Sequence, residues 1–289
     1  MAERGSPLRL IRCLAVLAVC AALAFPALAA RPYAADEIRA RDGFPQCLTA
    51  PNRGTLRYFA QNDPVWATMT YRYPHFENEP RFSGAGCVPS TIANCIVNLL
   101  PAEALPAIDR YSWRGEGFPI CPCSMNLYDC DGTHDRFRIR QAADFERYFC
   151  LVIGAYMSGN NSGRALVCGT LSMTDELCGI YGLRCERAES LAAAAEAVAR
   201  GALAVMMVGG EDCPLTTSGH ALLLCNADEH DYYFLDSFRR EKYKDDALHI
   251  VRVVQPGLIA VSRRQAYRLG AYQIIIVYPP EPVKATAGE

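Results

Sequence analysis

Apolar positions recur along the chain with two periods, and these predict the elements of a mixed helix-and-sheet fold. After Cys87, apolar residues return at spacings of three and four as far as Leu100, and Pro101 follows. This pattern predicts a helix that begins at Cys87, because apolar residues at such spacings form one buried face. Similar spacings predict further helices over 142–157, 174–181 and 189–200.

Short apolar runs predict strands in the remaining chain. They cover 55–60, 202–208, 221–226, 232–236, 249–254 and 272–278, and a short helix is predicted around 262–267. The third and fourth runs flank a turn-like segment and are predicted to form a hairpin. A turn centred near Asp228 places His220 opposite Asp236, whereas a centre one residue later places His220 opposite Phe238. In either register Asp236 lies within reach of His220.

Four polar side chains at the ends of these elements supply the groups that a cysteine nucleophile needs. Gln61 follows the first predicted strand, Cys87 begins the helix, and His220 and Asp236 bound the hairpin. Only a thiolate attacks, an imidazole generates it, and a fixed amide donor stabilises the oxyanion that forms. The free N–H groups at a helix start also favour a thiolate. The set predicts a cysteine hydrolase.

The N-terminus has the pattern of a secretory signal. Three arginines precede an apolar run over 13–25, and small residues at cleavage spacing follow at 26–30. We therefore expect residues 1–30 to be a removed signal peptide and the mature protein to be secreted or periplasmic. The run is shorter than the roughly 20 residues of a spanning helix, so no stable membrane span is expected after signal removal.

The rest of the chain is predicted to form one domain with an insertion. We expect an N-terminal arm over 31–54, a catalytic domain over 55–280, a cross-linked Cys-rich insertion over 101–140 and a tail over 281–289. The 289 residues are 51% apolar, which is enough for one large core. Net charge is −2, with basic residues spread along the chain, so no nucleic-acid or anionic-membrane surface is expected. The sequence does not indicate an oligomeric state.

The number of cysteines, together with the predicted export, indicates disulfides. Of fourteen cysteines, Cys13 and Cys20 fall in the predicted signal, which leaves twelve. In an exported protein most of these are expected to pair. If Cys87 is a free nucleophile, an odd number remains, so one further thiol is free or joined to another chain. Cys95, on the same predicted helix, is the best candidate.

A zinc site is the alternative for one group of these cysteines. Cys121, Cys123, Cys130 and His134 offer soft ligands, but their spacing does not match a common zinc motif. Export also favours disulfides over zinc. We therefore expect no metal and no cofactor.

The motifs around the four polar residues resemble those of the papain-like cysteine peptidase superfamily, particularly its bacteriocin-leader-processing branch. They are Gln-x-Asp-Pro-x-Trp at 61–66, Gly-Cys-x-Pro-Ser at 86–90, Gly-His at 219–220, and an acid at the end of the next strand. The resemblance implies an α+β fold in which a helical part, led by the nucleophile helix, packs on an antiparallel sheet. It also implies a peptide or protein substrate.

Carried over residue by residue, the resemblance makes Cys87 the nucleophile and His220 the general acid and base. Asp236 then orients the imidazole, and Gln61 donates to the oxyanion. Ala85 stands where such helix starts often have glycine, as does Val88, and the insertion has no counterpart in the pattern.

Other interpretations remain open at this stage. The same machinery could serve an acyl or peptidyl transferase of the phytochelatin-synthase kind, or a cell-wall peptide amidase. A non-catalytic, Cys-rich exported binding module with the same fold is a further alternative. Asp228 and Asp231 compete with Asp236 for the imidazole.

Overall fold

The computed structural model describes residues 45–71, 81–127, 130, 132, 136–160, 170–216, 218–241, 243 and 250–281. All of these belong to one compact unit, Pro32–Glu289. The predicted signal peptide, most of the predicted arm, His134 and residues 282–289 lie outside the described residues, so those predictions stay untested. Among the described residues, no helix combines the length and apolar character needed to cross a bilayer.

Helices and strands are both well represented, which confirms the α+β prediction. The helical elements are α3 (Phe82–Ala85), α4 (Cys87–Leu99), η1 (Ala102–Ala104), α5 (Ala107–Ser112), α6 (Ala142–Arg147), α7 (Phe149–Ala155), η3 (Tyr156–Asn160), α8 (Thr170–Ile180), α9 (Leu191–Ala199) and η4 (Ala266–Leu269). The strands are β1 (Gln46–Ala50), β2 (Gly54–Tyr58), β3 (Phe118–Ile120), β4 (Phe137–Ile139), β5 (Arg184–Arg187), β6 (Leu203–Val208), β7 (His220–Ala227), β8 (Asp231–Asp236), β9 (Val251–Gln255), β10 (Leu258–Ser262) and β11 (Gln273–Tyr278).

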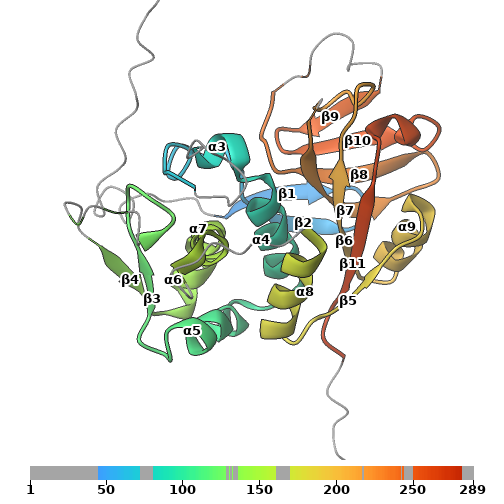
Figure 1. Ribbon diagram of the computed structural model, residues 1–289. Coiled ribbons are helices and arrows are strands. Elements are labelled where there is room, and N and C mark those ends of the chain that lie inside the picture. The colour runs from blue at the N-terminus through green and yellow to red at the C-terminus, as the bar shows by residue number, and fades with distance from the viewer. Residues whose placement is uncertain are drawn as a thin grey trace, which may run out of the picture. The chain divides into compact units, whose positions relative to one another are not determined.

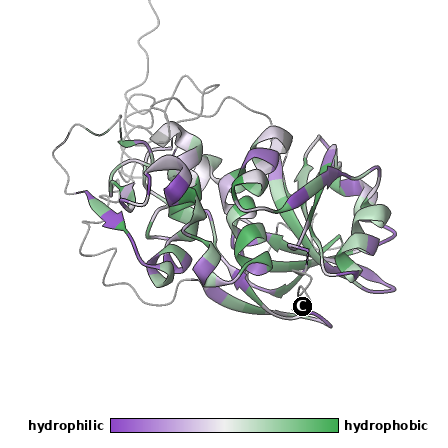
Figure 2. Cartoon of the chain, turned by 90° about the horizontal axis from the view of Figure 1, so that it is seen from below, coloured by the Kyte–Doolittle hydropathy of each residue, from purple (hydrophilic) through white to green (hydrophobic). Residues whose placement is uncertain are grey.

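A seven-stranded sheet in the order β5-β11-β6-β7-β8-β10-β9 forms one half of this unit, and its paired strands are antiparallel. Its central strands β6 and β7 are buried and largely apolar at successive positions, because both faces of the sheet are covered. Hydrophobic (green) colour predominates along the strands of the sheet in Figure 2. In β6, Leu203 and Val205 join the core on the α4 side, whereas Ala204 and Met206 join the core under α9.

The predicted helix at Cys87 is confirmed as α4, which lies between the smaller helices and the sheet (Figure 1). It contacts α7 on one side and β6, β7 and β2 on the other. Pro89 falls in its first turn, where a missing N–H costs no helical hydrogen bond. Cys95, the candidate for a further free thiol, is buried in this helix.

The predicted hairpin is β7–β8, and its register is the second of the two alternatives. Leu222 pairs with Asp236, so His220 lies diagonally from Asp236 rather than opposite it. An irregularity between Leu224 and Asn226 shifts the pairing by one residue. A bulge of this kind cannot be placed from an apolar run alone, because it changes the register without changing the pattern.

Several other elements differ from the sequence-based prediction. The helix expected over 142–157 is two helices, α6 and α7, which meet at Tyr148, a residue with non-helical dihedral angles. The strand β10 and the short pair β3–β4 were not predicted. The helix expected around 262–267 is the shorter η4, and the insertion contains regular elements rather than only irregular chain.

Part of the predicted arm is a strand, because β1 pairs with β2. The turn between them uses positive φ at Asn52 and Gly54. Arg53 at this turn donates hydrogen bonds to the carbonyl groups of Val198, Gly201 and Ala202 at the end of α9. These contacts attach the hairpin to the rest of the fold, and no local pattern in the sequence reveals them.

Candidate active site

Cys87 is the first residue of α4, and a close packing contact fixes the backbone just before it. The Gly86 N–H donates to the Phe82 carbonyl at 2.7 Å. A Cβ atom at Gly86 would lie 2.6 Å from that oxygen and 2.8 Å from the Phe82 ring, so only glycine fits here. The Cys87 side chain is half-buried at the N-terminal, positive end of the helix.

His220 and Asp236 form a buried pair at the end of the β7–β8 hairpin. The imidazole Nε2 lies 2.6 Å from the carboxylate Oδ1. The Cys87 thiol lies close enough to the imidazole to contribute to raising the pKa of His220. Because Nε2 faces Asp236, the other ring nitrogen, Nδ1, is the one available to Cys87. The structure therefore brings together three of the four predicted site residues around one imidazole.

The Asp236 carboxylate has further hydrogen-bond donors that sequence reasoning missed. The Phe238 N–H donates to Oδ1 at 2.9 Å, and the Tyr243 hydroxyl donates to Oδ2. The Arg240 guanidinium lies 4.0 Å from Oδ2. A fully buried carboxylate needs such partners to stay charged. Nothing in the sequence pattern identifies Tyr243 as a partner of Asp236, because Tyr243 lies in a polar segment after the hairpin.

The two members of the pair shift each other's pKa in opposite directions. Burial alone would lower the pKa of His220, but the charge and hydrogen bond of Asp236 outweigh burial and raise it. Burial would raise the pKa of Asp236, but His220, Arg240 and Tyr243 together keep it below its usual value. Both directions describe an imidazolium held by a carboxylate.

Gln61 is held in a bridge between the end of β8 and the short helix α3 that precedes α4. Its backbone N–H donates to the Ser237 carbonyl at 2.7 Å, and its side-chain Oε1 accepts from the Ser237 hydroxyl at 3.1 Å. Its Nε2 donates to the Ser83 carbonyl at 2.8 Å. An amide nitrogen carries two hydrogens, so one hydrogen is not used by this bond.

Two asparagines on α4 hold the strand that leads to Gln61. Asn94 accepts from the Phe59 N–H at 2.7 Å and donates to the Phe59 carbonyl at 3.0 Å. One turn later, Asn98 makes the same pair of bonds with Arg57, at 2.8 and 2.7 Å. Both residues lie on the helix that carries Cys87, so they set the position of Gln61 relative to Cys87.

A cavity of about 300 Å³ opens beside Cys87. Its lining is mainly apolar, with Tyr71, Val88 and Met207, and it includes Ser218 just before the His220 strand. The cavity is also lined by Ala85 and Val88, which stand where helix starts of the resembled family often have glycine. An apolar side chain of a ligand fits a cavity of this size and character.

The competing carboxylates have other partners. Asp228 caps the hairpin turn, where it accepts from the N–H groups of His230 and Asp231 at 2.8 Å. Asp231 forms an ion pair with Arg252 at 2.7 Å. Asp236 is thus the carboxylate that the structure places on the imidazole of His220.

None of the eleven described cysteines is in a disulfide, so the predicted disulfides stay a prediction. Cys121, Cys123 and Cys130 do lie close together, with all three sulfur atoms within 4.8 Å of one another. They are the described residues whose side chains could hold a soft metal ion.

No protein-family model matches the chain, and no curated protein matches its sequence. Among solved structures, the chain is similar to a crystal structure described as that of a candidate C39-like peptidase from Bacillus anthracis. The two are 12% identical, the match covers 78% of this chain and 98% of that chain, and the TM-score is 0.33. A likeness at this level does not show that the two proteins share a function.

Proposed function

We propose that the chain is a cysteine peptidase of the papain-like type. The observation that carries the proposal is the imidazole of His220, which is hydrogen-bonded to Asp236 through Nε2 and lies next to the thiol of Cys87. A thiol, an imidazole and an orienting carboxylate in contact are the parts of a nucleophilic triad. The antiparallel sheet and the nucleophile helix packed on it support the same class.

The reaction follows from the roles of these groups. In the resting pair His220 already holds the proton of the thiol as an imidazolium, and the Cys87 thiolate attacks the carbonyl carbon of a peptide bond. The negative charge that forms on the oxygen is stabilised by the free Nε2 hydrogen of Gln61 and by the Cys87 backbone N–H. His220 then protonates the leaving amine, and water hydrolyses the thioester. Asp236 orients the imidazole and stabilises its charged form.

Peptide bonds are the proposed substrate, with an apolar side chain next to the cleaved bond. The cavity beside Cys87 supports this choice, because Tyr71, Val88 and Met207 line it. Transfer of the acyl group to an added amine, instead of to water, would assign the same site to a transferase. Product analysis with and without a competing amine distinguishes the two.

Reactivity mapping tests the proposal with a control built into the chain. A peptidyl epoxide is added to the folded protein, and labelled cysteines are identified by mass mapping of peptides. Cys87 should react at least about 100-fold faster than the exposed Cys47, because positioned proton transfer contributes on the order of 100 to 10,000-fold. His220→Ala should remove that advantage. Equal labelling of Cys87 and Cys47 in the wild type would refute the nucleophile assignment.

The proposal places the peptidase outside the cytoplasm, on the signal pattern of residues 1–30. N-terminal sequencing of the mature protein should then start near Ala30 or Arg31. Retention of Met1 in the native protein would contradict export.

A further inference from the structure

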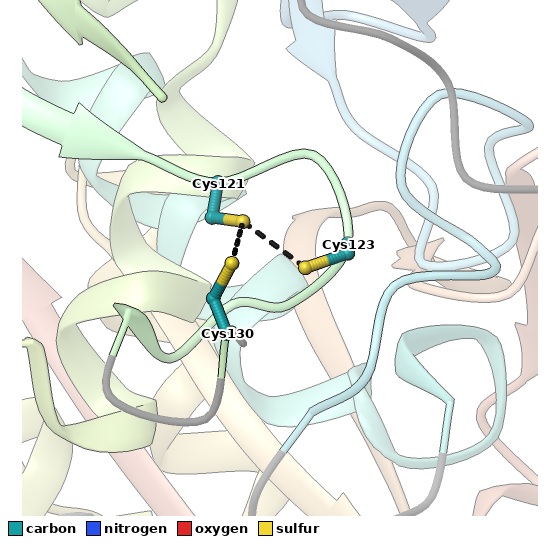
Figure 3. Close-up of side chains that lie close together, drawn as sticks. All are labelled: Cys121, Cys123 and Cys130. Carbon is teal, nitrogen blue, oxygen red and sulfur yellow. Dashed lines mark hydrogen bonds between the residues drawn. The ribbon is translucent and has the colours of Figure 1, made fainter. Parts of the chain in front are cut away.

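A second group of nucleophilic side chains lies between α5 and α6, outside the triad. The Cys121 sulfur is 3.1 Å from the Cys123 sulfur and 3.2 Å from the Cys130 sulfur, and the three side chains point toward one another (Figure 3). All three sulfurs lie within 4.8 Å of one another. We propose that Cys121, Cys123 and Cys130 bind a zinc ion as thiolates. The proposal is independent of the peptidase activity.

The sulfur positions fit a metal better than a disulfide. Tetrahedral zinc, with Zn–S distances of about 2.3 Å, holds its sulfur ligands about 3.8 Å apart. A disulfide needs about 2.05 Å. The observed separations of 3.1 and 3.2 Å are closer to the zinc spacing, which small side-chain rotations would reach. A disulfide would also use two sulfurs and leave the third without a partner, whereas all three converge on one point.

Zinc binds cysteine as the thiolate rather than the thiol. Three thiolates at these distances would repel one another unless a cation lay between them.

The charge around the cluster is complementary to such a site. Zinc with three thiolates has a net charge of −1. Arg136 and Arg138 line the same cavity of about 570 Å³ that Cys130 lines. The cavity also offers a route by which water can reach the fourth coordination position.

The cluster is joined to the wall of the active-site cavity. The Cys123 carbonyl accepts from the N–H of Thr70 at 3.0 Å, and the Met125 N–H donates to the Thr70 carbonyl at 2.9 Å. The next residue, Tyr71, lines the cavity beside Cys87. Zinc would therefore fix the segment that holds Tyr71 in place. The zinc site would thus have a structural role, because it stabilises one wall of the cavity beside Cys87.

Metal analysis of the full-length chain tests the proposal. The protein is purified without chelator and with a phosphine reductant, and zinc is measured by elemental mass spectrometry. We expect about one zinc per chain in the wild type. Cys121→Ser should lower the zinc content at least tenfold, whereas the matched control Cys213→Ser, at a buried cysteine in a separate core cluster, should leave it unchanged. Cobalt in place of zinc should give thiolate-to-metal absorption in the near ultraviolet.

A variant outside the ligand set gives an independent readout. Arg136→Ala should weaken zinc affinity about 10- to 100-fold, measured by competition with a chromophoric chelator. Two results would overturn the proposal. One is that the purified wild-type protein contains no zinc and shows no thiolate-to-metal absorption when cobalt is added. The other is a disulfide between two of the three cysteines in native protein, found by differential alkylation before and after reduction.

Discussion

Removing the Asn94 side chain should destabilise the protein strongly, because it leaves two buried backbone groups without partners. Asn94 is fully buried, and its amide satisfies both the N–H and the carbonyl of Phe59. Each buried polar group left unsatisfied costs about 1 to 3 kcal/mol. Asn94→Ala should thus lower the free energy of unfolding by about 2 to 6 kcal/mol, a large share of a typical total of about 5 to 15 kcal/mol.

Asn98 supplies the matched control one helical turn away. It makes the same two bonds with Arg57, but it is only half-buried, so water can replace the lost amide. Asn98→Ala should cost about 1 kcal/mol. Urea unfolding followed by far-ultraviolet circular dichroism measures both variants on one scale.

The same variants report on the site. The strand held by Asn94 leads directly to Gln61, so Asn94→Ala should also slow epoxide labelling of Cys87 in the protein that remains folded. Asn98→Ala should leave that rate nearly unchanged. If Asn94→Ala were no more destabilising than Asn98→Ala, the argument that a buried amide positions this strand would be wrong.

Three further changes test other contacts. Tyr243→Phe removes a hydrogen bond to the charged Asp236, so the free energy of unfolding should fall by about 1.5 to 3 kcal/mol, and an unchanged value in urea unfolding would contradict the contact. The pKa of His220 is raised from 6.5 to about 10, so its protonated form stabilises the fold fully below pH 6.5, and this contribution is lost as pH rises toward 10. The difference in Tm between wild type and His220→Gln should therefore shrink from pH 6 to pH 10, and a constant difference would refute the raised pKa. Gly86→Ala should cost about 1 to 3 kcal/mol through the clash at the helix start, whereas Gly84→Ala, with open space around it, should cost far less, and equal costs in urea unfolding would sink the packing argument.

The sequence predicts best those parts of the fold that a local pattern determines. The apolar spacing after Cys87 and the proline at 101 place α4 to within a residue. The apolar runs on either side of Asp228 place the hairpin, and hairpin geometry alone brings Asp236 near His220. These elements carry their signal within about a dozen residues, so no distant contact is needed to find them.

Contacts between distant segments have no such signal. The pairing of Asn94 with Phe59 depends on how α4 packs against β2, and the Tyr243 hydroxyl reaches Asp236 from a polar segment with no periodicity. The strand β1 escapes prediction for the same reason, since Arg53 anchors it to the end of α9. The catalytic roles of Cys87 and its partners stay predictions until the labelling experiment is done.

The bridge between Gln61 and Ser237 has a consequence for the order in which the protein acquires activity during synthesis. The two residues lie 176 positions apart, and the hydroxyl of Ser237 also reaches the carbonyl of Ala221 at 3.0 Å. The ribosome releases the thiol-bearing helix long before the imidazole and its carboxylate emerge. A nascent or truncated chain therefore has a thiol but no base and no fixed amide donor. If the proposed roles of these residues are correct, activity can appear only when nearly the whole chain has folded.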